Sequence, residues 1–311
     1  MNKPSPTSPI QASSNAAKLI LLAYTAALAV AVVTVNLVPG SVLMKAFWAD
    51  IAATLVIYGF SSYYRNASFY DAYWSIAPPL LALYFFVANS AQLDLRGLLV
   101  FALVWAWAIR LTHNWARGWQ GLDHEDWRYV DLQATTGRWW WLVNLLGIHL
   151  MPTLLVFIGC ISLHVVFTHT SGGFSIWDLV ASAIGWGALW LEYRADNELH
   201  NFKQNAEPGA LLSSGVWRWC RHPNYTGEIG FWVALYGYAC AASGGLGTGF
   251  AWLGPVVMLI LFVFISIPMI DKRMARNRPS YAQHMSTSFA LIPISHWVWP
   301  EASTDDSESL L

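Results

Sequence analysis

Charged residues are scarce in this sequence. Asp, Glu, Lys and Arg make up 11% of the 311 residues, whereas hydrophobic residues make up 56%. A soluble domain carries about 25% charged residues, so this chain has too little polar surface to cover a water-facing globule of its length. The sequence therefore indicates a protein whose natural solvent is a membrane.

Cysteine is also rare, and its scarcity excludes two kinds of structure. The three cysteines (Cys160, Cys220 and Cys240) cannot build a disulfide framework, and their spacing matches no zinc module. The nine histidines are scattered along the chain without a metal-binding spacing. We therefore expect no metal site.

Long apolar runs, in contrast, are abundant. A helix needs about 20 apolar residues to cross the hydrocarbon core. We predict an all-α, polytopic transmembrane helical bundle of about eight spans, with seven as the alternative because Lys45 and Asp50 interrupt the second. The predicted spans are 17–38, 46–63, 69–88, 96–115, 140–168, 176–200, 225–242 and 250–270. We expect one transmembrane domain over 17–298, between a disordered N-terminal tail at 1–16 and an acidic disordered tail at 299–311.

The cationic residues predict which loops face the cytoplasm. Lysine and arginine are concentrated in residues 116–139 and 201–224 and after residue 270, whereas residues 169–175 and 243–249 contain none. The positive-inside rule places the first group of segments in the cytoplasm.

Polar residues gather at the ends of these spans. The fourth span ends with Arg110, Asn114 and Arg117, whose spacing places them on one face of a helix. Asp196 lies near the end of the sixth span, and Asp71 opens the third. An ionisable residue at membrane depth is a candidate functional residue, although a single arginine at a helix end is commonly a snorkelling side chain and Asp71 equally suits an N-cap.

Together these groups suit a ligand that carries several phosphates. Arginine binds phosphate in a bidentate way, while carboxylates and amides orient hydroxyl and carboxamide groups. Asp196 can hold a ribose hydroxyl, and Glu228 or Asn224 can hold a carboxamide. The sequence has no Rossmann fingerprint, so we expect helices to bind any dinucleotide.

Several motifs resemble the steroid 5-alpha-reductase family, and most of all its bacterial membrane branch. The most specific of them is Arg-His-Pro-Asn-Tyr-Thr-Gly-Glu at 221–228. The resemblance covers about 65–295. Its other motifs are Asp-x2-Trp at 71–74, Arg-x3-Asn-x2-Arg at 110–117, Glu-Asp-x-Arg-Tyr at 125–129, Glu-x3-Asp at 192–196, Phe-Lys at 202–203 and Arg-Pro-Ser-Tyr at 278–281.

The resemblance implies reduction of a conjugated enone C=C bond in a steroid-like or other lipophilic 3-oxo substrate, with NADPH as cofactor. It implies a substrate that enters from the bilayer, contact with membrane lipid, and neither nucleic acid nor an obligate protein partner. It also implies a bacterial inner membrane, with the cofactor site facing the cytoplasm. The implied cofactor-binding residues are Arg110, Asn114, Arg117, Arg128, Asp196, Lys203, Arg221, His222, Asn224, Tyr225, Glu228 and Tyr281.

The family chemistry also implies an acid pair, a carboxyl group with a tyrosine, that stabilises the developing enolate oxygen. Asp71 matches the carboxyl by its placement seven residues before Pro78. Where steroid reductases carry the tyrosine, this sequence has Trp107. We therefore expect Tyr73, or another nearby tyrosine, to be the partner of Asp71.

A second family leaves an alternative open. Isoprenylcysteine carboxyl methyltransferases, which bind S-adenosylmethionine, share the Arg-His-Pro-x-Tyr-x-Gly core and resemble this chain near 211–295. They usually carry a paired glutamate after the last span, where this sequence reads Asp-Lys-Arg-Met at 271–274. That reading also leaves Asp71 and Arg110 without a role.

Overall fold

The computed structural model describes residues 9–169, 173–207 and 209–295, and all regular secondary structure within these ranges is helical. The helices form two compact units. The first unit comprises the described residues of 1–178 and 238–254, and the second comprises those of 179–237 and 255–311. The chain thus enters each unit twice, and the single domain expected over 17–298 stays a prediction.

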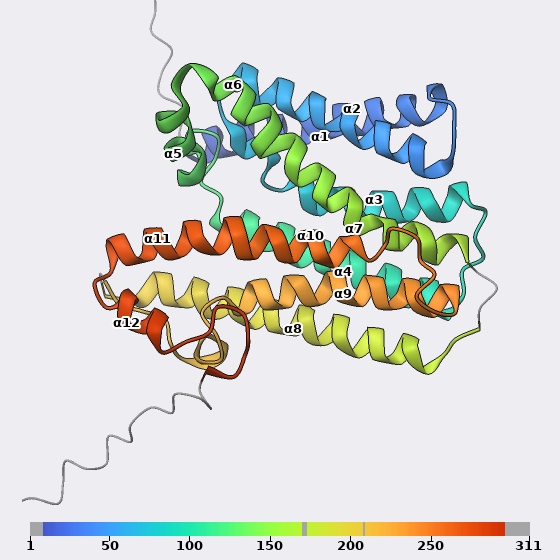
Figure 1. The fold of residues 1–311 in the computed structure, drawn as a ribbon. Helices are drawn as coiled ribbons and strands as arrows, with labels where there is room; N and C mark the ends of the chain where they lie inside the picture. The colour runs from blue at the N-terminus through green and yellow to red at the C-terminus, as the bar shows by residue number, and fades with distance from the viewer. Residues whose placement is uncertain (1–8, 170–172, 208, 296–311) are drawn as a thin grey trace, which may run out of the picture. The chain divides into compact units, whose positions relative to one another are not determined.

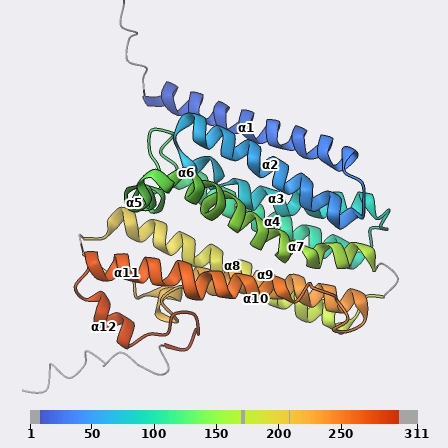
Figure 2. The same cartoon turned by 45° about the horizontal axis from the view of Figure 1, so that its top comes forward.

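The first unit begins with a helical hairpin of α1 (Pro9–Leu37) and α2 (Val42–Tyr64). Figures 1 and 2 show α1, α2, α3 and α7 side by side. The other elements of this unit are η1 (Ala67–Tyr70), α3 (Tyr73–Ala88), α4 (Leu95–Gly118), α5 (Trp127–Thr136), η2 (Gly137–Trp139), α6 (Trp140–Val143), the π-helical η3 (Asn144–Leu150) and α7 (Met151–Thr168).

Side-chain caps fix where these helices begin. Ser41 accepts a hydrogen bond from the Met44 amide at the start of α2, and Asp94 accepts one from the Gly97 amide at the start of α4. Each cap satisfies an amide that has no partner within its helix. Arg65 ends α2 in the left-handed conformation, with φ of 52°, and so turns the chain towards η1.

The second unit contains most of two long helices and of the apolar C-terminal helix, whose residues 176–178, 238–243 and 253–254 belong to the first unit. The long helices are α8 (Ile176–Asn205) and α9 (Pro223–Ser243), and the C-terminal helix runs without a break through α10 (Leu253–Leu261), the π-helical η5 (Phe262–Ser266) and α11 (Ile267–Asn277). Two short elements complete it, η4 (Gly215–Arg218) and α12 (Tyr281–Ser286).

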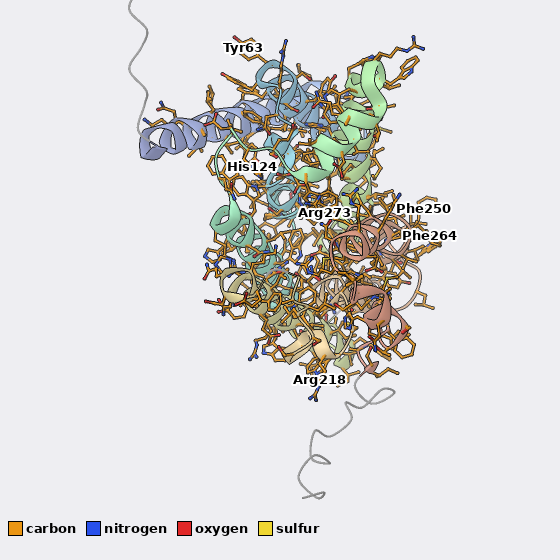
Figure 3. The ribbon with its side chains drawn as sticks, turned by 90° about the vertical axis from the view of Figure 1, so that its left-hand side faces the viewer. Tyr63, His124, Arg218, Phe250, Phe264 and Arg273 are labelled. Atoms are coloured by element: carbon orange, nitrogen blue, oxygen red, sulfur yellow. The ribbon has the colours of Figure 1, made fainter. Side chains whose placement is uncertain are left out.

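The outer surface of the helices is apolar, as a membrane protein requires. Leu21, Val33 and Phe264 are 55–72% exposed, and Figure 3 shows Phe264 on the outside of its helix. Six helical segments of the described chain are long and apolar enough to cross a membrane. They are Asn15–Leu37, Val42–Tyr64, Ala67–Ala88, Leu95–Gly118, Trp127–Thr168 and Leu253–Asn277. The protein is therefore a polytopic helical membrane protein.

The predicted spans 176–200 and 225–242 correspond to α8 and α9, which are helical but lie outside those six. One boundary was wrong, because α1 begins at Pro9, so residues 9–16 of the predicted N-terminal tail are helical. Residues 1–8 of that tail, and the predicted acidic tail at 299–311, lie outside the described residues.

Candidate active site

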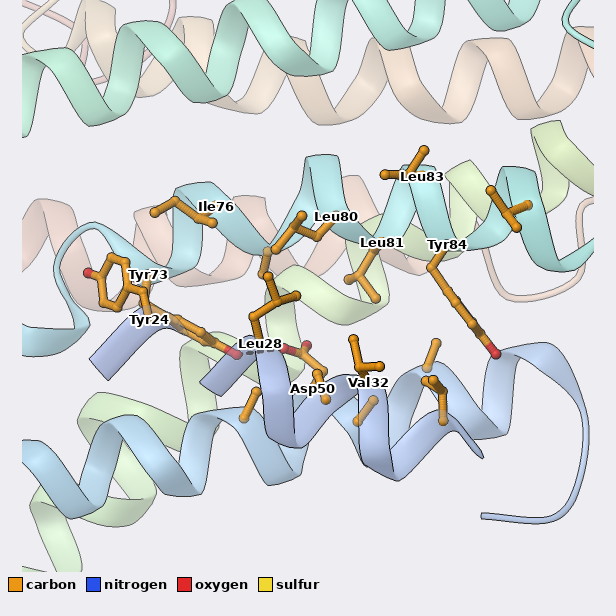
Figure 4. Close-up of a pocket in the computed structure, with 17 residues that line it drawn as sticks. Tyr24, Leu28, Val32, Asp50, Tyr73, Ile76, Leu80, Leu81, Leu83 and Tyr84 are labelled. Atoms are coloured by element: carbon orange, nitrogen blue, oxygen red, sulfur yellow. Dashed lines mark hydrogen bonds between the residues drawn. The ribbon is translucent and has the colours of Figure 1, made fainter. Parts of the chain in front are cut away.

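An apolar pocket lies between α1, α2 and α3 of the first unit. Its volume is about 320 Å³, and most of its walls are leucine, valine, isoleucine and alanine side chains. Asp50 is the single formally charged residue among those that line it (Figure 4). Leu28, Val32 and Val87 also line it and are 45%, 53% and 64% exposed. Because these apolar side chains are exposed, the pocket opens onto the apolar outer surface of the helices.

A carboxyl and a tyrosine meet in this pocket. The Tyr73 hydroxyl, at the start of α3, donates a hydrogen bond to Asp50 Oδ1 on α2 over 3.3 Å. Asp50 is 6% exposed, and its Oδ2 atom has no hydrogen-bond partner in the structure. Since no lining residue is cationic, an ionised carboxylate here would be buried without compensation. The pocket therefore favours a neutral carboxyl, which can donate its proton to an oxygen atom in the pocket.

Asp71 has a different tyrosine from the expected one. Its Oδ1 atom accepts a hydrogen bond from the Tyr129 hydroxyl over 2.6 Å, whereas Tyr73 bonds to Asp50. The expectation of Tyr73 as the partner of Asp71 was therefore wrong, and the alternative of another tyrosine agrees with the Tyr129 bond. The N-cap alternative was wrong too, because the N-cap of α3 is Ala72, which makes no side-chain capping bond.

Neither a functional role for Asp50 nor the hydrogen bond between Tyr129 and Asp71 was predicted from the sequence. Asp50 was treated only as an interruption of the second span, although a carboxylate within an apolar span is itself the signal that selected Asp71. Tyr129 belongs to the Glu-Asp-x-Arg-Tyr motif, but its partner lies 58 residues away in the sequence. No local pattern reveals such a contact.

The Glu-Asp-x-Arg-Tyr motif is fixed to η1. The Ala67 amide donates to Glu125 Oε1 over 2.6 Å, and the Asp126 amide donates to Ser68 Oγ over 3.2 Å. Burial raises the pKa of Glu125 above its ordinary value. These bonds hold the start of α5 against the segment that carries Asp71, and so they position Tyr129.

Two of the residues predicted to share a face of α4, Asn114 and Arg117, form hydrogen bonds with each other. Arg117 Nε and Nη2 both donate to Asn114 Oδ1, over 3.0 and 2.7 Å. Arg128 forms an ion pair with Asp126 at 2.8 Å and lies 5.6 Å from the centre of the Tyr129 ring. Arg110 is half-buried on the same helix as Asn114. The spacing was therefore right in bringing Asn114 and Arg117 together.

In the second unit, three predicted cofactor residues converge on Asp271 in α11. His222 Nε2 lies 2.9 Å from Asp271 Oδ1, and Arg221 Nη2 donates to Oδ2 over 3.2 Å. The Tyr281 hydroxyl donates to Oδ1, and burial together with this carboxylate raises the pKa of Tyr281. Arg221 also donates to the Ser288 carbonyl. The network binds the start of α9 to the C-terminal segment, so these side chains have a structural role.

The other predicted cofactor residues of this unit lie on α8 and α9. Asp196 and Glu228 are buried, and Glu228 accepts a hydrogen bond from the Trp232 indole over 3.0 Å. The Tyr225 ring stacks on the His222 ring, with centroids 5.5 Å apart. Asn224 Oδ1 is buried without a hydrogen-bond partner in the structure, which is the state expected of an amide that serves a ligand. Lys203 is exposed in the last turn of α8.

Metal ligation has no candidate in the described ranges. No group of three or more His, Cys, Asp or Glu side chains within them is arranged to hold an ion. The cysteines are free thiols.

These features define a polytopic α-helical membrane protein with a carboxyl–tyrosine pair in an apolar pocket. The chain belongs to the family described as protein of unknown function DUF1295, whose model matches residues 57–288. It is 26% identical to the uncharacterized protein C594.04c of Schizosaccharomyces pombe, over 78% of each chain. No solved structure matches the chain.

Proposed function

We propose that the protein is a membrane-embedded, NADPH-dependent reductase of a conjugated enone C=C bond in a lipophilic 3-oxo substrate. The observation that carries this proposal is the Tyr73–Asp50 hydrogen bond in the wall of an otherwise apolar pocket. Reduction of an enone needs an acid at the carbonyl oxygen, and a substrate dissolved in lipid needs that acid in an apolar chamber.

The pocket supports the substrate class by its size and lining. Its volume of about 320 Å³ lies within the usual range for small-molecule sites. Its walls offer apolar contacts along the length of the pocket and hydrogen-bonding groups at few points. A rigid hydrocarbon skeleton with one terminal carbonyl matches this pattern, because the skeleton contacts the walls and the carbonyl reaches Asp50.

Asp50 and Tyr73 would act as one acid. The proton on Asp50 Oδ2 is donated to the substrate carbonyl, while Tyr73 donates to Oδ1 and stabilises the carboxylate that forms. The Asp71–Tyr129 pair is the second candidate for this role, but Asp71 does not line the pocket.

NADPH, when bound, supplies the hydride that adds to the β-carbon of the enone. Two residues of the second unit suit parts of this cofactor. The orphaned amide oxygen of Asn224 fits the nicotinamide carboxamide, and buried Asp196 fits a ribose hydroxyl. This assignment follows the resemblance to steroid 5-alpha-reductases.

The test is NADPH oxidation by the purified protein in lipid nanodiscs, with progesterone as the probe for a 3-oxo-Δ4 enone. We expect substrate-dependent oxidation, and a loss of about 100-fold or more in kcat for Asp50→Asn, the size expected for removal of a general acid. Asp131→Asn, an exposed carboxyl on α5, is the matched control and should retain full rate. Binding of S-adenosylmethionine without binding of NADPH would refute the proposal and favour a methyltransferase. Wild-type turnover by Asp50→Asn would remove Asp50 as the acid.

A further inference from the structure

The apolar pocket between α1, α2 and α3 has hydrogen-bonding groups at two separate places. Four of the described residues that line it carry a polar side-chain group, namely Tyr24, Asp50, Tyr73 and Tyr84. Figure 4 shows Tyr24, Tyr73 and Asp50 near one another and Tyr84 well apart from them. Tyr84 is therefore a second polar point in the pocket, away from the Tyr73–Asp50 pair.

The two tyrosines near Asp50 already donate to protein atoms, whereas Tyr84 does not. The Tyr24 hydroxyl donates to the Phe69 carbonyl over 3.0 Å, and the Tyr73 hydroxyl donates to Asp50 Oδ1 over 3.3 Å. The Tyr84 hydroxyl makes no hydrogen bond to any residue that the structure describes. Lipid tails offer a hydroxyl no partner, so an oxygen atom of a molecule in the pocket would complete this bond favourably.

The position of Tyr84 also suits another role, which its burial argues against. Tyrosines near the ends of membrane spans commonly anchor a helix at the lipid headgroups, and Tyr84 lies four residues before Ala88, the last residue of α3. Tyr63, near the end of α2, fits that role because it is 81% exposed. Tyr84 is half-buried, and in Figure 4 its side chain extends from α3 towards α1 and α2. It therefore belongs to the wall of the pocket.

The length of the pocket follows from the spacing of its lining residues on α3. They recur every three or four positions, from Tyr73 through Ala77 and Leu80 to Tyr84, and so form one continuous helix face. Tyr73 and Tyr84 are 11 residues apart, which is about 16 Å along a helix axis. A molecule held by a hydrogen bond of about 2.8 Å at each end would carry its two oxygen atoms roughly 10 Å apart.

We propose that Tyr84 is a specificity-determining residue that forms a hydrogen bond with a second oxygen of the substrate, at the end opposite the enone carbonyl. The identity of the first oxygen as an enone carbonyl rests on the proposed function, whereas the subsite at Tyr84 concerns binding alone. A phenol hydroxyl can donate to a ketone or accept from a hydroxyl, so either group fits. The substrate class is then a rigid, fused-ring lipophile with an oxygen at each end.

The first test measures binding without turnover. Testosterone has a hydroxyl at the end opposite its 3-ketone, and androst-4-en-3-one lacks that hydroxyl. Each steroid is used to displace tritiated progesterone from the purified protein in nanodiscs, and the ratio of the two affinities is compared between the wild-type protein and Tyr84→Phe. The different partitioning of the steroids into lipid cancels in this comparison. We expect the preference for testosterone to fall about three- to tenfold in Tyr84→Phe, the size of one net hydrogen bond.

The matched control is Tyr63→Phe, which removes a hydroxyl from an exposed tyrosine of α2 that does not line the pocket. It should leave the affinity ratio unchanged. Equal ratios in Tyr84→Phe and the wild-type protein would overturn the proposal and leave Tyr84 as an interfacial anchor. Failure of both steroids to displace progesterone, or no saturable binding of progesterone, would overturn it as well.

Turnover separates this proposal from the reductase function. We expect Tyr84→Phe to raise the KM for testosterone about three- to tenfold more than the KM for androst-4-en-3-one, because the lost bond is made equally in the bound substrate and the transition state. If binding depends on Tyr84 but the wild-type protein oxidises no NADPH, the reductase function fails and the subsite stands. If NADPH is oxidised with either steroid while the affinity ratio does not depend on Tyr84, the subsite fails and the reductase function stands.

Discussion

Gly227 lies in the Arg-His-Pro-Asn-Tyr-Thr-Gly-Glu motif, where α9 packs closely against α8. The substitution Gly227→Ala, which adds one methyl group, tests this packing. A Cβ atom at Gly227 would lie 2.4 Å from Glu192 Cγ and 2.8 Å from the Ala188 carbonyl oxygen on α8. The glutamate side chain can rotate away, but the carbonyl belongs to the helix backbone. An ordinary contact begins at 3.4 Å, so the two helices must separate by about 0.6 Å, which is 3.4 minus 2.8.

The cost of that separation can be estimated. A gap of this size forfeits a quarter to a half of the dispersion energy of each affected contact, and overpacking typically costs about 1 to 3 kcal/mol. The neighbouring contact between Gly230 and Ala188, where a Cβ atom would lie 2.9 Å from the Ala188 Cβ, would loosen as well. Because the helix preference of alanine over glycine offsets roughly 0.5–1 kcal/mol of the upper end of this cost, we expect Gly227→Ala to destabilise the protein by about 2 kcal/mol, or roughly 3–6 °C in Tm.

The assay is thermal unfolding in detergent, followed by size-exclusion chromatography of heated samples. The matched control is Gly187→Ala on α8, where a new Cβ atom would meet nothing within 4 Å. Because alanine favours a helix over glycine by roughly 0.5–1 kcal/mol, Gly187→Ala should be neutral or slightly stabilising. Equal Tm values for Gly227→Ala and the wild-type protein would refute the packing argument, and so would an equal loss in Gly187→Ala.

Three further predictions concern polar contacts. Asp71→Asn should lower the free energy of unfolding by about 1 kcal/mol, because it weakens the hydrogen bond from Tyr129, and should lower kcat less than tenfold. A fall in kcat as large as that of Asp50→Asn would instead make Asp71 the acid. Asp178→Asn should destabilise by about 3–5 kcal/mol, measured by thermal unfolding, because it leaves the buried Arg96 charge without its 2.6 Å ion pair. Asn224→Ala and Asp196→Ala should abolish NADPH binding in equilibrium titrations with the melting temperature retained, and unchanged affinity in both would mean that the cofactor site lies elsewhere.

The composition and the apolar runs determined the fold class, because runs of about 20 apolar residues in a chain with so few charges satisfy their backbone polar groups as membrane-spanning helices. Spacing along one helix also predicted local contacts correctly. Asn114 and Arg117 meet because residues three apart share a helix face. These features depend on neighbours in sequence, so the sequence is sufficient to predict them.

Pairings between helices could not be predicted in this way. Asp50 meets Tyr73, and Asp71 meets Tyr129, because of how each helix is rotated and shifted against its neighbours. Asp271, seen in the sequence only as a departure from a paired glutamate, accepts bonds from the motif at 221–228. Helical periodicity states which residues share a face, but packing of whole side-chain surfaces decides which faces meet and at what depth. That choice, made only in the tertiary structure, places a carboxyl and a tyrosine together in an apolar pocket.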